Sequence, residues 1–179
     1  PEKIYLLQSN SDPFEVWLNR MLRDRPLVTE LGMGTGDFLV SMAKRHPEKF
    51  FIGIEVKADR VYKAFRKSHV QGIENIVYLR TGIEKLHQFA FPKMEKIFLL
   101  FPDPWPKKRH LERRLTGAPY LQQYRTMLAN NGALIFKTDD ENLFSSTLDI
   151  MKKEHWKVLR LERNYKTEEA DKTAYERRF

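Results

Sequence analysis

The sequence predicts an α/β domain: a doubly wound, mostly parallel β-sheet with helices on both faces. Two observations predict it: short runs that are apolar at almost every position, and segments of helical periodicity that alternate with them. Strands buried on both faces of a parallel sheet read as continuous apolar runs, and helices connect them. A length of 179 residues suits a single domain, residues 1–179, with a core large enough to fold without cross-links.

The elements follow in order from these patterns. Helices are expected where apolar residues recur at three- and four-residue spacing, as in Val61, Ala64 and Phe65, and the first of them closes before Pro47. Strands are expected at the apolar runs between the helices, with a last strand near the C-terminus. The predicted strands are 27–31, 50–54, 76–79, 97–101, 133–136 and 156–161, and the predicted helices are 38–45, 58–68, 120–128 and 143–151.

Composition excludes several classes of protein. The chain has no cysteine, which rules out disulfides, thiolate metal sites and cysteine nucleophiles. Its five histidines lack the spacing of metal ligands, so we expect no metal site. No apolar run approaches the roughly 20 residues that span a membrane, and no signal peptide opens the chain. We therefore expect a cytoplasmic protein with no membrane contact.

The net charge of +8 is concentrated in two short windows. Residues 57–67 and residues 107–114 each carry +4, so together they hold the whole formal excess. Positive charge gathered in this way is typical of proteins that bind a polyanion, and nucleic acid is the first candidate. A merely solvated basic loop is the alternative for the second window. That window contains Lys107, Lys108, Arg109, Arg113 and Arg114, and arginine binds phosphate oxygens in pairs.

A glycine-rich turn follows the first predicted strand, with Gly32, Gly34 and Gly36 at alternate positions. Glycines there let the backbone turn tightly and approach a ligand closely. Glu55 ends the second predicted strand, 19 residues past Gly36, where an acid usually binds a ribose diol. Each feature alone would suit an ordinary turn and a surface glutamate. Together they predict a cofactor that contains adenosine.

The charge of this turn indicates which cofactor. Glu30 stands two residues before the first glycine, where it would repel the pyrophosphate of a dinucleotide. S-adenosylmethionine instead carries a cationic sulfonium and an ammonium group, which a carboxylate attracts. The glycine spacing is also GxGxG and not the GxGxxG of dinucleotide sites. The sequence therefore favours S-adenosylmethionine.

Acidic residues follow two more of the predicted strands. Three prolines surround Asp103 in the stretch FPDPWP of residues 101–106, and such a rigid backbone can hold an acid at the rim of a site. A stiff connector with a solvated acid is the alternative. The fifth strand ends in Lys137, Thr138, Asp139 and Asp140. Asp139 can converge with Asp103 on one ligand, while Thr138 or Asp139 can N-cap the next helix, and these roles can coexist.

Taken in order, these motifs resemble the tRNA (guanine-N7)-methyltransferase family, which has a Rossmann-like class I methyltransferase fold. The resemblance runs from about Val28 to the last residue. The glycine motif is shared by most class I methyltransferases, whereas the stretch PDPWPKKRH of residues 102–110 is far more specific. The other matching stretches are GIEV at 53–56, RRLT at 113–116, FKTD at 136–139 and TAYERRF at 173–179.

The resemblance implies transfer of a methyl group from S-adenosylmethionine to N7 of a guanosine in the tRNA variable loop, at position 46. It marks Asp103 as the catalytic residue, and Thr173 and Glu176 as neighbours of the target base. Together with the charge pattern, it gives a set of cofactor-binding residues: Glu30, Gly32, Gly34, Gly36, Glu55, Val56, Gly82, Ile83 and Asp103. The corresponding substrate-binding set is Lys107, Arg109, Arg113, Arg114, Asp139, Thr173, Tyr175 and Glu176.

The chain departs from the family pattern in two places. Where the family has an Asp-Ala pair that would flank the adenine, this chain has Gly82 and Ile83. Backbone contacts survive there, but a side-chain acceptor for the adenine amino group is lost. The family usually continues past the final Phe into one more strand, and the chain starts without methionine, so we expect residues to be missing at one or both ends.

The predicted chemistry needs no general base, because guanine N7 has a free lone pair and carries no proton. Catalysis is then mainly alignment of N7 with the methyl–sulfur bond, with Asp103 or Asp139 stabilising the charge that develops on guanine. The partner is tRNA, and the oligomeric state is a monomer or a homodimer. A non-catalytic RNA-binding subunit that keeps the fold is the alternative, followed by another methyltransferase and by an NAD-dependent oxidoreductase.

Overall fold

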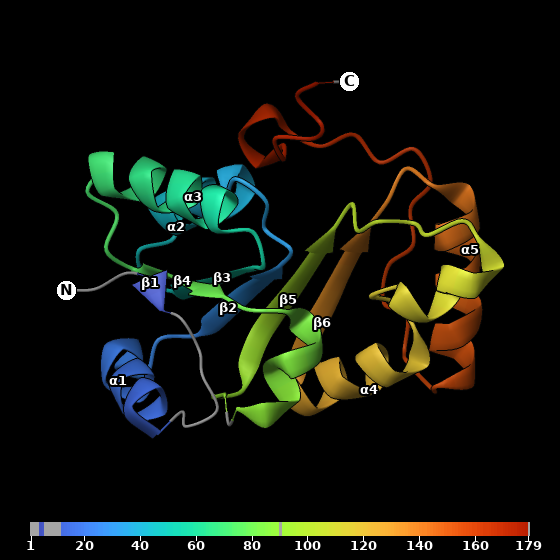
Figure 1. Ribbon diagram of the computed structural model, residues 1–179, viewed down its shortest axis with the longest axis horizontal. Coiled ribbons are helices and arrows are strands. Elements are labelled where there is room, and N and C mark those ends of the chain that lie inside the picture. Colours follow the sequence, from blue (N-terminus) through green and yellow to red (C-terminus); the bar gives the residue numbers. More distant parts are fainter. Residues whose placement is uncertain (1–3, 6–11, 90, 179) are drawn as a thin grey trace.

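The computed structural model describes residues 4–5, 12–89 and 91–178 of the chain. Six parallel strands form one sheet in the order β1-β4-β3-β2-β5-β6 (Figure 1). The strands are β1 (Ile4–Tyr5), β2 (Leu27–Leu31), β3 (Phe50–Glu55), β4 (Ile76–Arg80), β5 (Met94–Leu100) and β6 (Leu128–Lys137). The predicted doubly wound parallel sheet is therefore confirmed, and five of its six predicted strands are present.

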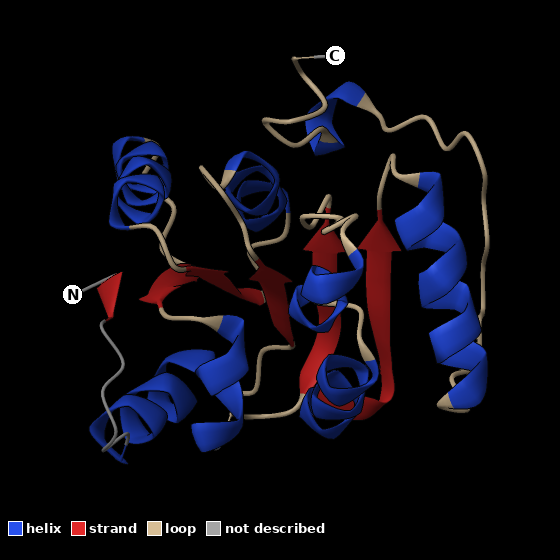
Figure 2. Ribbon diagram, turned by 45° about the vertical axis from the view of Figure 1, so that its right-hand side comes forward, coloured by secondary structure: helices blue, strands red, loops and turns tan. Residues whose placement is uncertain are grey.

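Helices cover both faces of the sheet, which gives three layers (Figure 2). The α-helices are α1 (Asp12–Leu22), α2 (Asp37–Arg45), α3 (Ala58–Val70), α4 (Ala118–Met127) and α5 (Glu141–Lys153). Three 3-10 helices lie in the connections: η1 (Ile83–Gln88), η2 (Lys108–Arg113) and η3 (Glu169–Asp171). All four predicted α-helices are confirmed, and α1 is an addition to them.

Two hydrophobic cores flank the sheet because successive residues of a strand face opposite sides. On β3, Phe50 and Ile52 pack with α1, η1 and α4, whereas Phe51 packs with α2 and α3. These side chains are at most 1% exposed. Burial on both faces explains why the strands read as unbroken apolar runs.

The order of the strands reverses beside β2. From β2 the chain moves outward to β3 and β4, then returns to the other side of β2 for β5 and β6. In open α/β sheets a ligand binds at such a reversal, beyond the carboxyl ends of the strands. The glycine turn after β2 and the proline stretch after β5 both begin at this edge, because Leu31 of β2 is paired with Leu99 of β5.

The prediction of a strand at 156–161 is wrong. The segment has no regular secondary structure and pairs with no strand among the described residues, so β6 stays at the edge of the sheet. Val158, Leu159 and Leu161 are 44%, 75% and 49% exposed. The run is apolar in sequence but is not buried by other elements of the fold, and a strand that packs against nothing gains little from joining a sheet.

Asn75 fastens the end of α2 to the start of β3. Its Nδ2 lies 2.9 Å from the Ala43 carbonyl and 3.0 Å from the carbonyls of His46 and Lys49, and the residue is 7% exposed. The last carbonyls of a helix have no partner within the helix, so the Asn75 amide supplies the missing donor.

We expect Asn75→Ala to lower the free energy of unfolding by about 2 kcal/mol, because buried carbonyl groups lose their donor. Urea denaturation followed by circular dichroism measures this. Gln71→Ala is the control, because Gln71 is exposed on the same side of the sheet. Equal, small losses in the two variants would contradict the structural role given to Asn75.

Candidate active site

The glycine turn between β2 and α2 lies at the strand-order reversal. Gly32, Gly34 and Gly36 have φ angles of 70°, 57° and 72°, a left-handed conformation that favours glycine. A Cβ added at Gly32 or Gly34 would meet nothing within 4 Å, so the space above these two residues is free for a ligand. At Gly36 an added Cβ would lie 2.6 Å from the Ala64 Cβ, so this glycine permits close packing of α2 on α3.

Glu30 lies beneath this turn, on β2, and is 3% exposed. Its Oε2 has no hydrogen-bond partner among the described residues. Burial, with the nearby carboxylates of Asp37 and Glu55, raises the pKa of Glu30 well above its ordinary value, against a smaller opposing effect of the Leu39 backbone N–H. A buried carboxylate with a free oxygen is poised to receive a cation or a hydrogen-bond donor.

Glu55 ends β3 and is 5% exposed. Its Oε2 accepts a hydrogen bond from the Gly34 N–H at 3.1 Å, and its Oε1 accepts one from the Lys57 N–H at 2.9 Å. The Arg60 guanidinium lies 3.7 Å from Oε2. Both carboxylate oxygens are therefore fixed at the edge of the glycine turn, beside Val56, which is 60% exposed.

Lys67, near the C-terminal end of α3, binds the glycine turn and fixes its position. Lys67 Nζ donates to the Thr35 carbonyl at 2.9 Å and to Asp37 Oδ2 at 2.7 Å, and the Thr35 hydroxyl donates to the same Asp37 oxygen at 2.6 Å. Burial raises the pKa of Asp37, but the hydrogen bonds from Lys67 and Thr35 outweigh it, so the net shift is downward. Asp37 thus stays ionised and holds the turn against α3.

Much of the first basic window is therefore paired with acids. Arg60 is beside Glu55, Lys63 lies 3.8 Å from Asp59, and Lys67 binds Asp37. Sequence reasoning missed this role of α3, although an acid directly after the last glycine was a visible signal. We therefore expect this window to contribute less to nucleic-acid binding than the second one.

The proline stretch after β5 presents Asp103 to solvent. Phe101 and Trp105, on either side of it, have left-handed φ angles of 49° and 41°, which cost energy in residues other than glycine. Arg114 holds this conformation: its Nε donates to the Pro104 carbonyl at 2.8 Å, and its guanidinium donates to the Ser146 hydroxyl on α5 at 2.9 Å.

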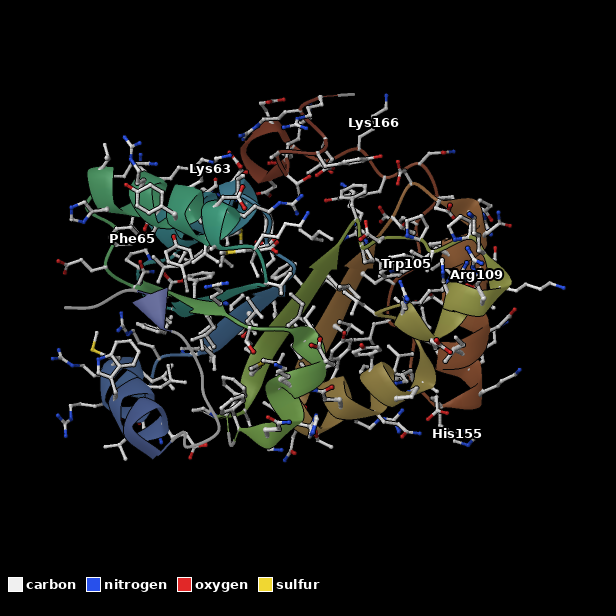
Figure 3. All side chains as sticks on the ribbon, in the orientation of Figure 1. Lys63, Phe65, Trp105, Arg109, His155 and Lys166 are labelled. Carbon is white, nitrogen blue, oxygen red and sulfur yellow. The ribbon has the colours of Figure 1, made fainter. Side chains whose placement is uncertain are left out.

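The cations of the second basic window fall into two groups that differ in solvent exposure. Lys107, Lys108 and Arg109 are exposed at the start of η2, and Figure 3 shows Arg109 close to Trp105. Arg113 is also exposed, with its guanidinium 5.1 Å from the centre of the Trp105 ring. Arg114 is half-buried and bound to Pro104 and Ser146, contacts that the sequence did not predict, while its assignment to substrate binding stays a prediction.

The end of β6 is covered by the C-terminal segment, residues 165–178 (Figure 1). Lys137 Nζ contacts the Glu176 carboxylate and the Thr167 hydroxyl, and lies 5.3 Å from the centre of the Phe101 ring. Burial raises the pKa of Glu176, but hydrogen bonds from Lys137, Thr167 and the Thr173 backbone make the net shift downward. Glu176 is thus ionised, and its contact with Lys137 holds this segment at the end of β6.

Other contacts place this segment beside the predicted base-binding acid. The Tyr175 hydroxyl donates to Asp139 Oδ2 at 2.6 Å, and the Tyr175 ring lies 5.0 Å from that of Phe101. The Thr173 hydroxyl accepts from the Glu176 N–H at 3.2 Å, which fixes the turn between them. Asp139, Thr173, Tyr175 and Glu176 are therefore brought together, as the sequence analysis grouped them.

The helix cap after β6 is not where the sequence placed it. Asp140, and neither Thr138 nor Asp139, caps α5: its Oδ1 accepts from the Leu143 N–H at 2.7 Å. Thr138 instead accepts a hydrogen bond from the Asp140 N–H at 3.1 Å. Asp139 is left with Tyr175, on the side of the C-terminal segment.

Gly82 and Ile83 follow β4, the strand outside β3. The Ile83 side chain is 8% exposed and packs in the core with Leu86, so only the Ile83 backbone can face a ligand. Its carbonyl accepts a hydrogen bond from the Gln123 side chain at 3.4 Å. Gly82 precedes η1 with an ordinary extended backbone.

Elsewhere, the described residues offer no second candidate for an active site. Two cavities of about 570 and 700 Å³ lie at the opposite, amino-terminal edge of the sheet, near Leu27 and Asn75. Within residues 4–5, 12–89 and 91–178, no three acidic or histidine side chains gather as a metal site would require. No helix of the described part is long and apolar enough to cross a membrane.

This fold and site define a Rossmann-like class I methyltransferase. A solved ribosomal protein L11 methylase from Lactobacillus delbrueckii subsp. bulgaricus has the same fold, with a TM-score of 0.60 at 16% identity over 84% of this chain and 70% of that one. Residues 24–179 match the model of a family described as "Putative methyltransferase".

Two curated relatives narrow the family, and both carry the name tRNA (guanine-N(7)-)-methyltransferase. The protein from Brevibacillus brevis is 40% identical over 74% of this chain and 63% of its own length. That from Mycoplasma genitalium is 40% identical over 80% of this chain and 70% of its own length. The chain thus spans about 63% of the length of the first curated relatives that it matches. It belongs to the tRNA (guanine-N7)-methyltransferase family.

We expect Glu30→Gln to change how stability depends on pH. The pKa of Glu30 in the folded protein is raised above its ordinary value of 4.5, so above about pH 4.5 the unfolded chain releases this proton first and the folded state loses stability as pH rises. Glutamine cannot ionise and escapes this loss. Urea unfolding between about pH 4 and pH 8 should therefore show that the free energy of unfolding of the variant rises relative to that of the wild type as pH increases. Parallel curves would contradict the assignment.

Proposed function

We propose that this chain transfers a methyl group from S-adenosylmethionine to N7 of a guanosine in tRNA, at position 46 of the variable loop. The observation that carries the proposal is the buried Glu30 carboxylate, with one unpartnered oxygen, beneath an open glycine turn at the strand-order reversal. The names of the curated relatives support the reaction and the substrate class. A cytoplasmic location is part of the proposal.

The residues of the site suit a cationic adenosine cofactor. Glu30 would bind the ammonium group of the cofactor. Burial raises the pKa of Glu30, and a positive charge beside the carboxylate would lower it again. Gly32 and Gly34 leave room for the methionine part, and Glu55 would exchange its backbone partners for ribose hydroxyls. S-adenosylmethionine supplies an electrophilic methyl group on a positively charged sulfur. Around the adenine would lie Val56, Gly82 and Ile83.

The chain's contribution to the chemistry is alignment and charge stabilisation. Guanine N7 needs no base to remove a proton, so positioning it in line with the methyl–sulfur bond supplies most of the rate. A carboxylate that accepts hydrogen bonds from guanine N1–H and N2–H becomes a better partner as positive charge develops on the ring. In this proposal Asp103 on the proline stretch or Asp139 beside Tyr175 would do this. The base would displace the Tyr175 hydroxyl from Asp139.

The first experiment tests the reaction itself. Unmodified tRNA is incubated with the protein and methyl-labelled cofactor, and the modified nucleotide is mapped by borohydride reduction and aniline cleavage, which cut at N7-methylguanosine. Cleavage at position 46 is the expected result. Binding of tRNA by a protein that does not bind the cofactor would favour the alternative, a non-catalytic RNA-binding subunit.

We expect Asp103→Ala to lower turnover more than tenfold, which corresponds to at least about 1.4 kcal/mol of barrier. The unfolding midpoint should stay unchanged, because the side chain is exposed and accepts no hydrogen bond from the described residues. Single-turnover methyl transfer at saturating tRNA measures the effect. A variant that kept wild-type turnover would exclude Asp103 as the catalytic residue.

We expect the two groups of cations in the second basic window to behave differently. Lys107→Ala/Arg109→Ala removes two exposed charges, so the plot of log affinity for tRNA against log salt should flatten by about one to two units. Arg114→Ala removes an equal charge per site but releases the proline stretch, so it should lower turnover and leave the slope unchanged. Filter binding at several salt concentrations measures the slopes. A flattened slope for Arg114→Ala would return this residue to the phosphate-binding group.

A further inference from the structure

The glutamate two residues after Gly82 lies where a side chain at position 82 would project. A Cβ added to Gly82 would be 2.1 Å from Glu84 Oε1, and 2.5 Å from both Glu84 Oε2 and the carboxyl carbon. The Glu84 carboxylate thus fills the space that the absent side chain leaves open. Glu84 is exposed, and no described residue forms an ion pair or hydrogen bond with its carboxylate.

The order of the strands places this carboxylate next to the proposed adenosine site. Glu55 ends β3, and β4 is the next strand outward from β2 and β3. Ile54 and Glu55 are paired in register with Leu79 and Arg80. A cofactor with its ammonium group at Glu30 on β2 and its ribose at Glu55 on β3 would therefore have its base over the end of β4, where Glu84 lies.

The chemistry of the carboxylate suits the exocyclic amino group of adenine. Ile83 points into the core, so no side chain of that residue can meet the base. A carboxylate accepts hydrogen bonds and donates none when ionised, whereas adenine N6 is a donor. A hydrogen bond that involves a charged partner is also stronger than one between neutral groups.

We propose that Glu84 binds the adenine amino group of the cofactor and so replaces the side chain that position 82 lacks. The inference rests on the proposed function, because it needs an adenosine cofactor at this site. It makes Glu84 a specificity-determining residue: it selects a purine with a 6-amino group. The departure at Gly82 and Ile83 is then a relocation of the acceptor by two residues and not its loss.

Isothermal calorimetry tests this with two probes: S-adenosylhomocysteine, and the same molecule with hydrogen in place of the 6-amino group. The wild type should bind the first probe about tenfold or more tightly than the second. Glu84→Ala should weaken the first about tenfold and leave the second unchanged, so that the preference disappears. Glu84→Gln should keep much of the preference, because its amide oxygen is still an acceptor.

Two further variants make the result specific. Gly82→Asp in the Glu84→Ala background should restore the preference, because it returns a carboxylate to the same space. Glu74→Ala is the matched control: Glu74 is exposed near the start of β4, at the opposite edge of the sheet, and its loss should change neither affinity.

Three outcomes decide the question. If Glu84→Ala keeps the preference, or weakens both probes equally, Glu84 does not bind the amino group, and the proposed function stands. If the wild type binds the first probe without any preference over the second, the inference also fails. If the wild type does not bind S-adenosylhomocysteine at all, the proposed function itself is overturned.

Discussion

The position of β2 at the centre of the sheet is the constraint on which the site depends. With β3 on one side and β5 on the other, β2 is buried on both faces, and Glu30 near its end is buried with it. The cost of holding an ionised carboxylate there falls when a proton, a cation or a hydrogen-bond donor reaches its free oxygen. The glycine turn directly above, with its open space, provides the route by which a ligand can do so.

The lysines and arginines of the two basic windows differ in whether a carboxylate lies beside them. On α3, Arg60 and Lys67 face the carboxylates that surround the glycine turn, and they stabilise the geometry of an acidic site. At the start of η2, Lys107 and Arg109 face solvent, where a polyanion can replace water without breaking an ion pair among the described residues. The two windows carry the same net charge. What distinguishes them is that cations of the first lie beside carboxylates, whereas Lys107 and Arg109 of the second face solvent.

The C-terminal segment joins the two sides of the reversal. Lys137 and Asp139 at the end of β6 bind Glu176 and Tyr175, while Arg177 lies 3.7 Å from Asp37 at the start of α2. Arg45 on α2 also pairs with Asp171 of η3. A segment far along the chain therefore contacts both the glycine turn and the predicted base-binding acid. Residues predicted to bind substrate and residues beside the predicted cofactor site are thus held by the same segment.

Local patterns explain what could be predicted. Apolar runs and glycine spacing depend on a residue's immediate neighbours, so strands β2 to β5, the glycine turn and the acids Glu30 and Glu55 were identified from sequence. The motif after β5 was specific enough to indicate the family. Hydrogen-bond partners were harder even at short range, and the cap of α5 at Asp140 was missed by one residue.

The sequence by itself determined the doubly wound sheet and the acidic, glycine-rich edge where its strand order reverses. Only the tertiary structure decided that 156–161 stays outside the sheet, that Arg114 is half-buried and donates to the Pro104 carbonyl, and that Glu84 fills the space beside Gly82. The physical reason is range: periodicity and turn chemistry are set by residues a few positions apart. Pairing, ion-pair partners and filled space are set by which distant residues the fold brings into contact.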